Sequence, residues 1–228
     1  MQRSVMVPAT IAFLSVVAVV SLGSTAGATG QSRDLAKLAN NDVNAPALTA
    51  GVTYQASLFP LALRVTVPDG SWFGGQGKMI SQKRGSFGWA EFLQSPPGKP
   101  LGSISMISSY GPTKSVAATV AQLRTGGHGA TYQATSHVKL GGFSGSEFDG
   151  RVVGKTHVFI PFTPLTHAAT YHPDAYRFYQ GEVFRIIVLG VRGKTVVLLL
   201  ENAALPADRF PAFLTSANQI LGTLQFPR

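Results

Sequence analysis

The sequence predicts an α+β fold, an antiparallel β-sheet with two packed helices, on three observations. Most apolar segments are short, and they are either rich in β-branched residues or alternate with polar residues, as β-strands do. Two segments, near 115–125 and 208–221, instead repeat apolar residues at helical spacing. The chain therefore reads as strands, a helix, strands, a hairpin and a helix, with no internal repeat of fixed period.

The composition fits one globular domain that needs no covalent cross-links. The chain has 228 residues, of which 45% are hydrophobic and 13% charged, and this argues against disorder. It has no cysteine, which excludes disulfides, thiolate metal sites and cysteine nucleophiles. A formal net charge of +9 favours anionic partners. The basic residues are scattered, however, without the run or motif of a nucleic-acid reader, so we expect no specific nucleic-acid ligand.

The N-terminus has the three-part pattern of a secretory signal peptide. A positive charge at Arg3 precedes an uncharged apolar run from Val5 to Leu22, and small residues follow. Ala26 and Ala28 form a cleavage site, so residues 1–28 are predicted to be removed after Ala28. The alternative is an uncleaved anchor, since the run approaches the ~18–20 residues that span a bilayer. The sequence thus predicts a secreted or cell-envelope protein whose membrane contact, if any, is through this segment.

The predicted domain spans 51–228, after a partly disordered linker at 29–50. Its first strands are 53–59 and 61–67, the second alternating apolar and polar residues, and a turn at Pro68–Gly70 ends the pair. "GGQGK", residues 74–78, is predicted to be a mobile surface loop. Further strands are predicted at Met79–Gln82, Trp89–Leu93 and Ser103–Ile107.

The second half of the domain contains both helices and the clearest hairpin. The first helix covers Ser115–Thr125, with a hydroxyl residue to cap its start. Two runs rich in β-branched residues, 182–191 and 194–202, flank an Arg-Gly turn and predict a central hairpin covered on both faces. The last helix begins near Asp208. Other strands are predicted at Thr131–Ser136, Ser146–Val153 and His157–Phe162.

These features resemble a known architecture. The strand pair, the "VPDGSW" turn, the helix, "VKLGGFSGSEFDGRV", the hairpin and the final helix are similar to the PsbP/Mog1-like α/β sandwich over residues 52–226. They are also similar to secreted actinobacterial proteins of unknown function with that architecture. The resemblance implies the fold and a binding or assembly role, and it carries no catalytic residues. Ser71, inserted before Trp72, and the longer segment 163–180 depart from the pattern.

The segment "KLGGFSGSEFDG" contains a candidate nucleophile, Ser144. A nucleophile elbow requires G-x-S-x-G on a strand-to-helix turn. Here Ser146 replaces the last glycine, and a strand-like pattern follows. We therefore expect a hairpin turn in which Gly141, Gly142 and Gly145 supply positive φ angles.

Other short motifs also predict structure rather than chemistry. "GKT" at 154–156 and 193–195 lacks the spacing and helix of a phosphate-binding loop, so both are predicted to be hairpin turns. Glu147 and Asp149 share a face of one strand with Arg151, which favours a salt-bridged edge over paired acid–base carboxylates.

The strongest candidate for a binding surface is the aromatic segment 161–180. Tyrosine and arginine suit binding surfaces, and loops often carry function. The predicted ligand-binding residues are His167, Tyr171, His172, Tyr176, Arg177 and Tyr179. The alternative is a loop that covers one end of the sheet. The spacing of His167, His172 and Asp174 fits no common zinc site, so no metal is predicted.

The sequence as a whole predicts a secreted or envelope-associated, non-catalytic binding or assembly domain without a cofactor. Its partner is an unknown protein or an anionic cell-envelope component. Two alternatives remain: an extracellular hydrolase that uses Ser144 or a loop histidine, and a small-molecule or lipid carrier with a cavity between sheet and helices.

Overall fold

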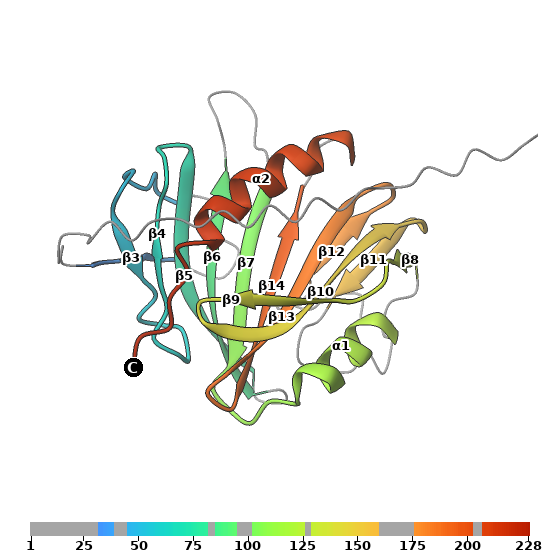
Figure 1. The fold of residues 1–228 in the computed structure, drawn as a ribbon, viewed down its shortest axis with the longest axis horizontal. Coiled ribbons are helices and arrows are strands. Elements are labelled where there is room, and N and C mark those ends of the chain that lie inside the picture. The colour runs from blue at the N-terminus through green and yellow to red at the C-terminus, as the bar shows by residue number, and fades with distance from the viewer. Residues whose placement is uncertain are drawn as a thin grey trace, which may run out of the picture.

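The fold is α+β, and most of it is one large sheet. The computed structural model of the protein describes residues 32–38, 45–81, 85–94, 102–125, 129–159, 176–202 and 207–228. The main sheet has the order β2-β5-β6-β7-β14-β13-β10-β8, with β9 also paired to β10 (Figure 1). All its pairings are antiparallel except β2 with β5. The strands are β2 Ala36–Lys37, β5 Trp72–Ser81, β6 Gly85–Gln94, β7 Gly102–Ser109, β8 Ala130–Tyr132, β9 Ser136–Leu140, β10 Phe143–Val152, β13 Val183–Val191 and β14 Lys194–Glu201.

Two small sheets accompany the main one. The first contains the strands predicted at the start of the domain, here shorter, with a parallel strand added from the N-terminal side. The second pairs the strands that come directly before and after residues 160–175. Their strands are β1 Arg33–Asp34, β3 Thr53–Gln55 and β4 Arg64–Thr66 in the first, and β11 Thr156–Phe159 and β12 Tyr176–Tyr179 in the second.

The β13–β14 hairpin lies in the centre of the sheet, as predicted. Its turn residues Arg192 and Gly193 have φ angles of 49° and 76°, as in the tight turns that match strand twist. Along β13, Ile187 belongs to one core cluster while its neighbours Ile186 and Val188 belong to the other. Because successive side chains point to opposite faces, both faces of the hairpin are covered.

The two helices lie on opposite faces of this sheet. α2, Phe210–Leu221, packs with the first small sheet on one face and buries Phe213, Ala217 and Ile220. Pro211 is tolerated in its first turn. α1, Val116–Thr125, packs against the other face through Leu123. Among the described residues, no helix has both the length and the apolar character needed to cross a bilayer.

The prediction of a surface loop at "GGQGK" is wrong, because these residues lie in β5 and are buried except for Lys78. Glycine here provides space for neighbouring side chains rather than flexibility. A Cβ at Gly77 would lie 2.4–2.5 Å from the indole of Trp89 on β6, closer than atoms can approach. The polar residue in the middle, Gln76, is fully buried.

The predicted linker and the "GGFSGS" turn also differ from the structure. Within 29–50, β1 and β2 add to two sheets, and Leu35 and Leu48 join the core. The turn before β10 consists of Gly141 and Gly142, with φ angles of 57° and 83°. Gly145 lacks the expected positive φ, because it lies within the strand.

The two "GKT" segments have different roles. The second forms part of the predicted β13–β14 hairpin. The first lies at a bend between β10 and β11, which are not paired with each other. There Gly154 N donates a hydrogen bond to Gly129 O at 2.9 Å. The chain thus leaves the main sheet at this point instead of turning back on itself.

Candidate functional site

The predicted aromatic site is only partly described by the structure. His167, Tyr171 and His172 lie outside the described residues. Tyr176 and Arg177 begin β12 opposite β11, but their side chains are not described. Tyr179 closes β12 and is 56% exposed. The grouping of these six residues into one site therefore remains a prediction.

Ser144 lies within β10, exposed and opposite Lys139 of β9. This is neither a strand-to-helix turn nor the predicted hairpin turn itself. His137 lies two residues further along β9, opposite Ser146. Within the described part of the chain, no hydrogen bond joins Ser144 to His137. The structure therefore does not show the serine–base hydrogen bond of an activated nucleophile at this residue.

The carboxylates of Glu147 and Asp149 are salt-bridged as predicted, but to an arginine on a different strand. Asp149 lies opposite Arg185 of β13 and accepts hydrogen bonds from its Nε and Nη2 at 2.7 and 3.0 Å. Glu147 lies 3.8 Å from the same guanidinium. The hydrogen bond to Asp149 raises the pKa of Arg185 further. These carboxylates are therefore paired acceptors, not free acid–base groups.

A second pair of carboxylates lies across β6, β7 and β14. Ser103 Oγ donates to Glu201 Oε1 at 3.0 Å, and Ser105 Oγ lies 3.5 Å from Glu91 Oε1. Burial raises the pKa of Glu91, and burial raises that of Glu201 to about 7, with the charges of Glu91 and Glu182 adding to the effect. The sheet face thus holds a carboxyl that titrates near neutral pH.

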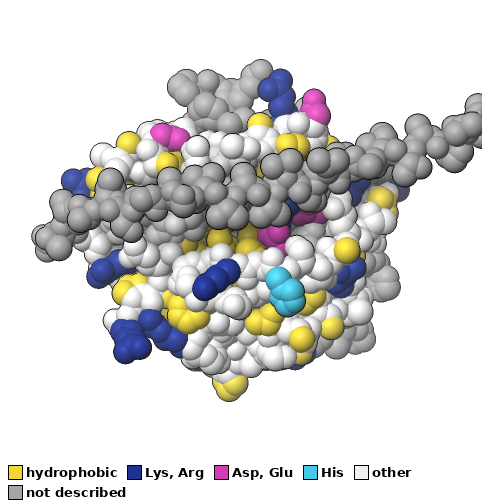
Figure 2. Space-filling model, viewed as in Figure 1, with side chains coloured by type: hydrophobic (Ala, Val, Ile, Leu, Met, Phe, Trp, Pro, Cys, Tyr) yellow, Lys and Arg dark blue, Asp and Glu magenta, His cyan; other side chains and the backbone are white. Residues whose placement is uncertain are grey.

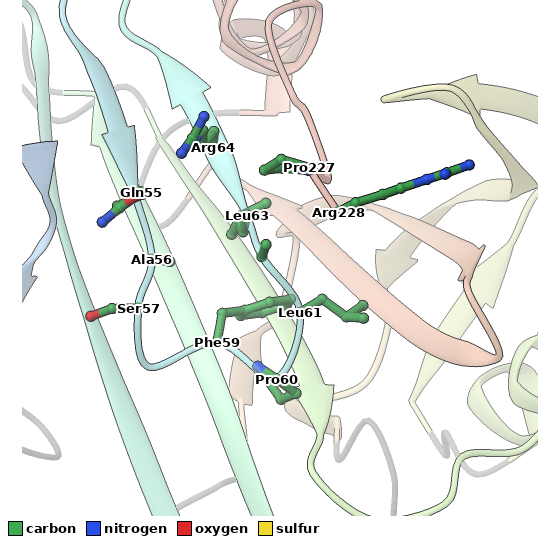
Figure 3. A pocket seen from close by; sticks show the side chains of 11 residues that line it. Gln55, Ala56, Ser57, Phe59, Pro60, Leu61, Leu63, Arg64, Pro227 and Arg228 are labelled. Carbon is green, nitrogen blue, oxygen red and sulfur yellow. The ribbon is translucent and has the colours of Figure 1, made fainter. Parts of the chain in front are cut away.

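A surface cavity lies between the β3–β4 connection and the last residues of the chain (Figure 3). We call it the tail pocket; its volume is about 330 Å³. Its lining consists of Gln55, Ala56, Ser57, Phe59, Pro60, Leu61, Ala62, Leu63, Arg64, Pro227 and Arg228. Most of these side chains are apolar, and two are cationic. Small-molecule sites commonly have such a volume and an apolar centre with a few polar groups.

The first wall of the tail pocket, residues 56–63, is held from beneath by Gln76. Its Oε1 accepts a hydrogen bond from Leu58 N at 2.7 Å, and its Nε2 donates to Leu35 O at 2.8 Å and to Ser57 Oγ at 3.2 Å. The hydroxyl of Tyr110 also donates to Leu58 O. A buried amide with every group paired fixes its neighbours strongly, so this wall is preformed.

The second wall is the chain end, and it is held by side chains from other parts of the molecule. Gln225 and Arg64 exchange two backbone hydrogen bonds, both of 2.9 Å. The Arg192 guanidinium donates to Phe226 O, and to Pro227 O at 2.7 Å. The Phe226 ring packs edge-on against Phe143 at 5.6 Å. The last residues are therefore held in place on both sides.

The two cations differ in their placement at the tail pocket. Figure 3 shows Leu61, Leu63 and Pro227 around its centre, Arg64 near Leu63 and Pro227, and the side chain of Arg228 extending away from the other lining residues. Arg64 is half-buried, whereas Arg228 is exposed. Among the described residues, the Arg64 guanidinium has no hydrogen bond or ion pair.

Sequence reasoning missed both the tail pocket and the Glu91–Glu201 pair. The pocket walls come from segments about 160 positions apart, and the carboxylates come from separate strands, so no local motif marks either one. The available signal was the apolar alternation around Leu61 and Leu63, beside Pro60. It indicated a strand but not the exposed cavity at its start.

Comparison with known proteins gives no functional name. No model of a known protein family matches the chain, and no curated protein matches it. A solved structure from Bacteroides thetaiotaomicron VPI-5482 is similar over 73% of this chain, with 11% identity and a TM-score of 0.34. The chain spans 45% of that protein's length.

Proposed function

We propose that the protein is an exported, non-catalytic binding domain and that the tail pocket is its ligand site. The observation that carries the proposal is the preformed cavity, whose two walls are fixed by Gln76 and by Arg192. Preformed sites lose less entropy on binding than mobile ones. The N-terminal signal pattern and the similarity to PsbP/Mog1-like sandwiches support a binding or assembly role outside the cytoplasm.

The lining of the tail pocket supports binding rather than catalysis. Among the residues that the structure describes, the lining has no histidine, aspartate or glutamate. Ser57, a hydroxyl side chain of the lining, donates a hydrogen bond to Asp34 at 2.6 Å and accepts one from Gln76 Nε2 at 3.2 Å, so it is already engaged within the protein. The predicted hydrolase at Ser144 has less support, because that serine is the second residue of a β-strand and does not lie on a strand-to-helix turn.

The test is an NMR titration of the ¹⁵N-labelled mature chain with a panel of small apolar fragments. We expect bound fragments to shift the amides of 56–64 and 225–228. Leu61→Gln, at a half-buried residue of the lining, should abolish these shifts. Val153→Gln is the matched control, since Val153 is 54% exposed and outside the pocket.

Two results would overturn the proposal. One is the absence of any fragment that shifts these amides. The other is shifts that persist in Leu61→Gln, which would place the ligand elsewhere.

A further inference from the structure

We infer that the ligand of the tail pocket is an anionic amphiphile, an apolar chain or ring that carries a carboxylate or phosphate. The apolar part lies between Leu61, Leu63 and Pro227, and the anionic head lies at Arg64. This inference rests on the proposed function and adds the chemical class of the ligand.

The centre of the tail pocket is lined mainly by apolar side chains. Phe59 and Leu63 form its floor and are 5% and 2% exposed, while Pro60, Leu61 and Pro227 are half-buried around it. Filling this space with hydrocarbon removes further apolar area from water, which is favourable. A small polar anion alone would leave these apolar side chains in contact with water.

Of the two cations, Arg64 is better placed than Arg228 to bind the anionic head. Its backbone is held in β4 by the paired bonds to Gln225, so binding need not order the backbone there. Arg185 and Arg192 each bond to protein acceptors, whereas the guanidinium of Arg64 has none among the described residues. A guanidinium presents a planar set of donors that fits carboxylate and phosphate oxygens. Arg228, being exposed, would lose more side-chain freedom on binding.

The charged side chains visible around the chain end in Figure 2 are mainly basic. Figure 2 shows several Lys and Arg side chains, with no acidic side chain visible among them, at the lower left of the molecule, where the chain ends in Figure 1. The nearby carboxylate of Asp34 lies two strands from Arg64, across Gln55. It already accepts the hydrogen bond from Ser57.

The experiment measures binding of four probes by calorimetry and by amide shifts, below their aggregation concentrations. Decanoate and decyl phosphate carry both parts of the ligand, decanol lacks the charge, and acetate lacks the chain. We expect the two anionic amphiphiles to bind the wild type at least about tenfold more tightly than decanol or acetate. The tighter of the two identifies the head as carboxylate or phosphate.

Two variants locate the head. Arg64→Gln should weaken decanoate or decyl phosphate about tenfold and leave decanol unchanged. Arg151→Gln, at an exposed arginine of β10, should leave all four probes unchanged. Equal binding of decanol and the anions, or full affinity in Arg64→Gln, would overturn the inference while the pocket stands as a binding site. If none of the probes shifts residues 56–64 and 225–228, the proposed function fails as well.

Discussion

The guanidinium of Arg192, in the tight turn between β13 and β14, donates hydrogen bonds to the carbonyl oxygens of Phe226 and Pro227. It also lies 5.8 Å from the centre of the Phe143 ring. A residue of the central hairpin thus holds the chain end that forms one wall of the tail pocket.

Arg192→Asn should therefore loosen the chain end while preserving the turn, because asparagine tolerates positive φ. We expect a loss of about 1 kcal/mol in unfolding free energy and faster amide hydrogen exchange at 224–228. Urea denaturation and exchange measurements provide the check. Unchanged exchange at the chain end would show that the two carbonyl contacts do not hold it.

Gly77→Ala should destabilise the protein by about 1–3 kcal/mol, because the new methyl group would overlap the Trp89 indole. The matched control is Gly70→Ala, where a Cβ meets nothing within 4 Å. That variant should stay within about 0.5 kcal/mol of the wild type. Chemical denaturation of both variants checks the pair, and equal stabilities would contradict the packing role of Gly77.

Glu201 should make stability depend on pH. Its pKa is raised from 4.5 to about 7, so the folded state binds its proton more tightly than the unfolded state does. The resulting stabilisation is complete below pH 4.5 and is lost as pH rises through 7, an effect of about 3 kcal/mol.

Glu201→Gln cannot ionise and should lack this component. Urea denaturation from pH 4 to 8 gives the test as the difference between wild type and variant, which cancels the titrating groups that do not interact with Glu201. The free energy of unfolding of the variant, relative to that of the wild type, should increase as pH rises. A constant difference would show that Glu201 titrates normally.

Asp149→Asn should lower the free energy of unfolding by about 1–2 kcal/mol. The half-buried Arg185 would lose the charged carboxylate that accepts two of its hydrogen bonds. Arg151→Gln should be close to neutral, since Arg151 is exposed. Thermal unfolding of the two variants distinguishes the cross-strand pair from the same-strand pair. A larger effect at Arg151 would favour the pairing that sequence spacing predicted.

Expression of the full chain in a secreting host should yield a mature protein that begins at Thr29. N-terminal sequencing and intact mass of the released protein check the position of the cut. A product that keeps residues 1–28 and stays with the membrane fraction would favour the anchor.

The elements predicted best are those whose pattern is local. The α1 face with Leu123, the α2 stripe with Phe213, and the β13–β14 hairpin each follow from spacing within about a dozen residues. These segments fix which side chains face the core, and hence the sandwich itself.

The features that sequence could not predict depend on strand register. Asp149 pairs with Arg185 rather than Arg151 because those two residues are directly opposite on neighbouring strands. From the sequence, the glycines around Gly77 are predicted to form a loop. The role of Gly77 is to make room for Trp89, and that role becomes visible only when the neighbouring strand is known. The tail pocket likewise exists only once the chain end reaches β4.

The buried amide of Gln76 has a consequence for anyone who redesigns this protein. One side chain of β5 satisfies Leu58 N, Leu35 O and Ser57 Oγ at once, so two separate stretches of chain, 57–58 and the one at Leu35, share a single anchoring point. Residues 56–63 therefore cannot be lengthened, grafted or randomised as an independent module. Any library built on that loop must keep Gln76 fixed and must also retain the early segment around Leu35.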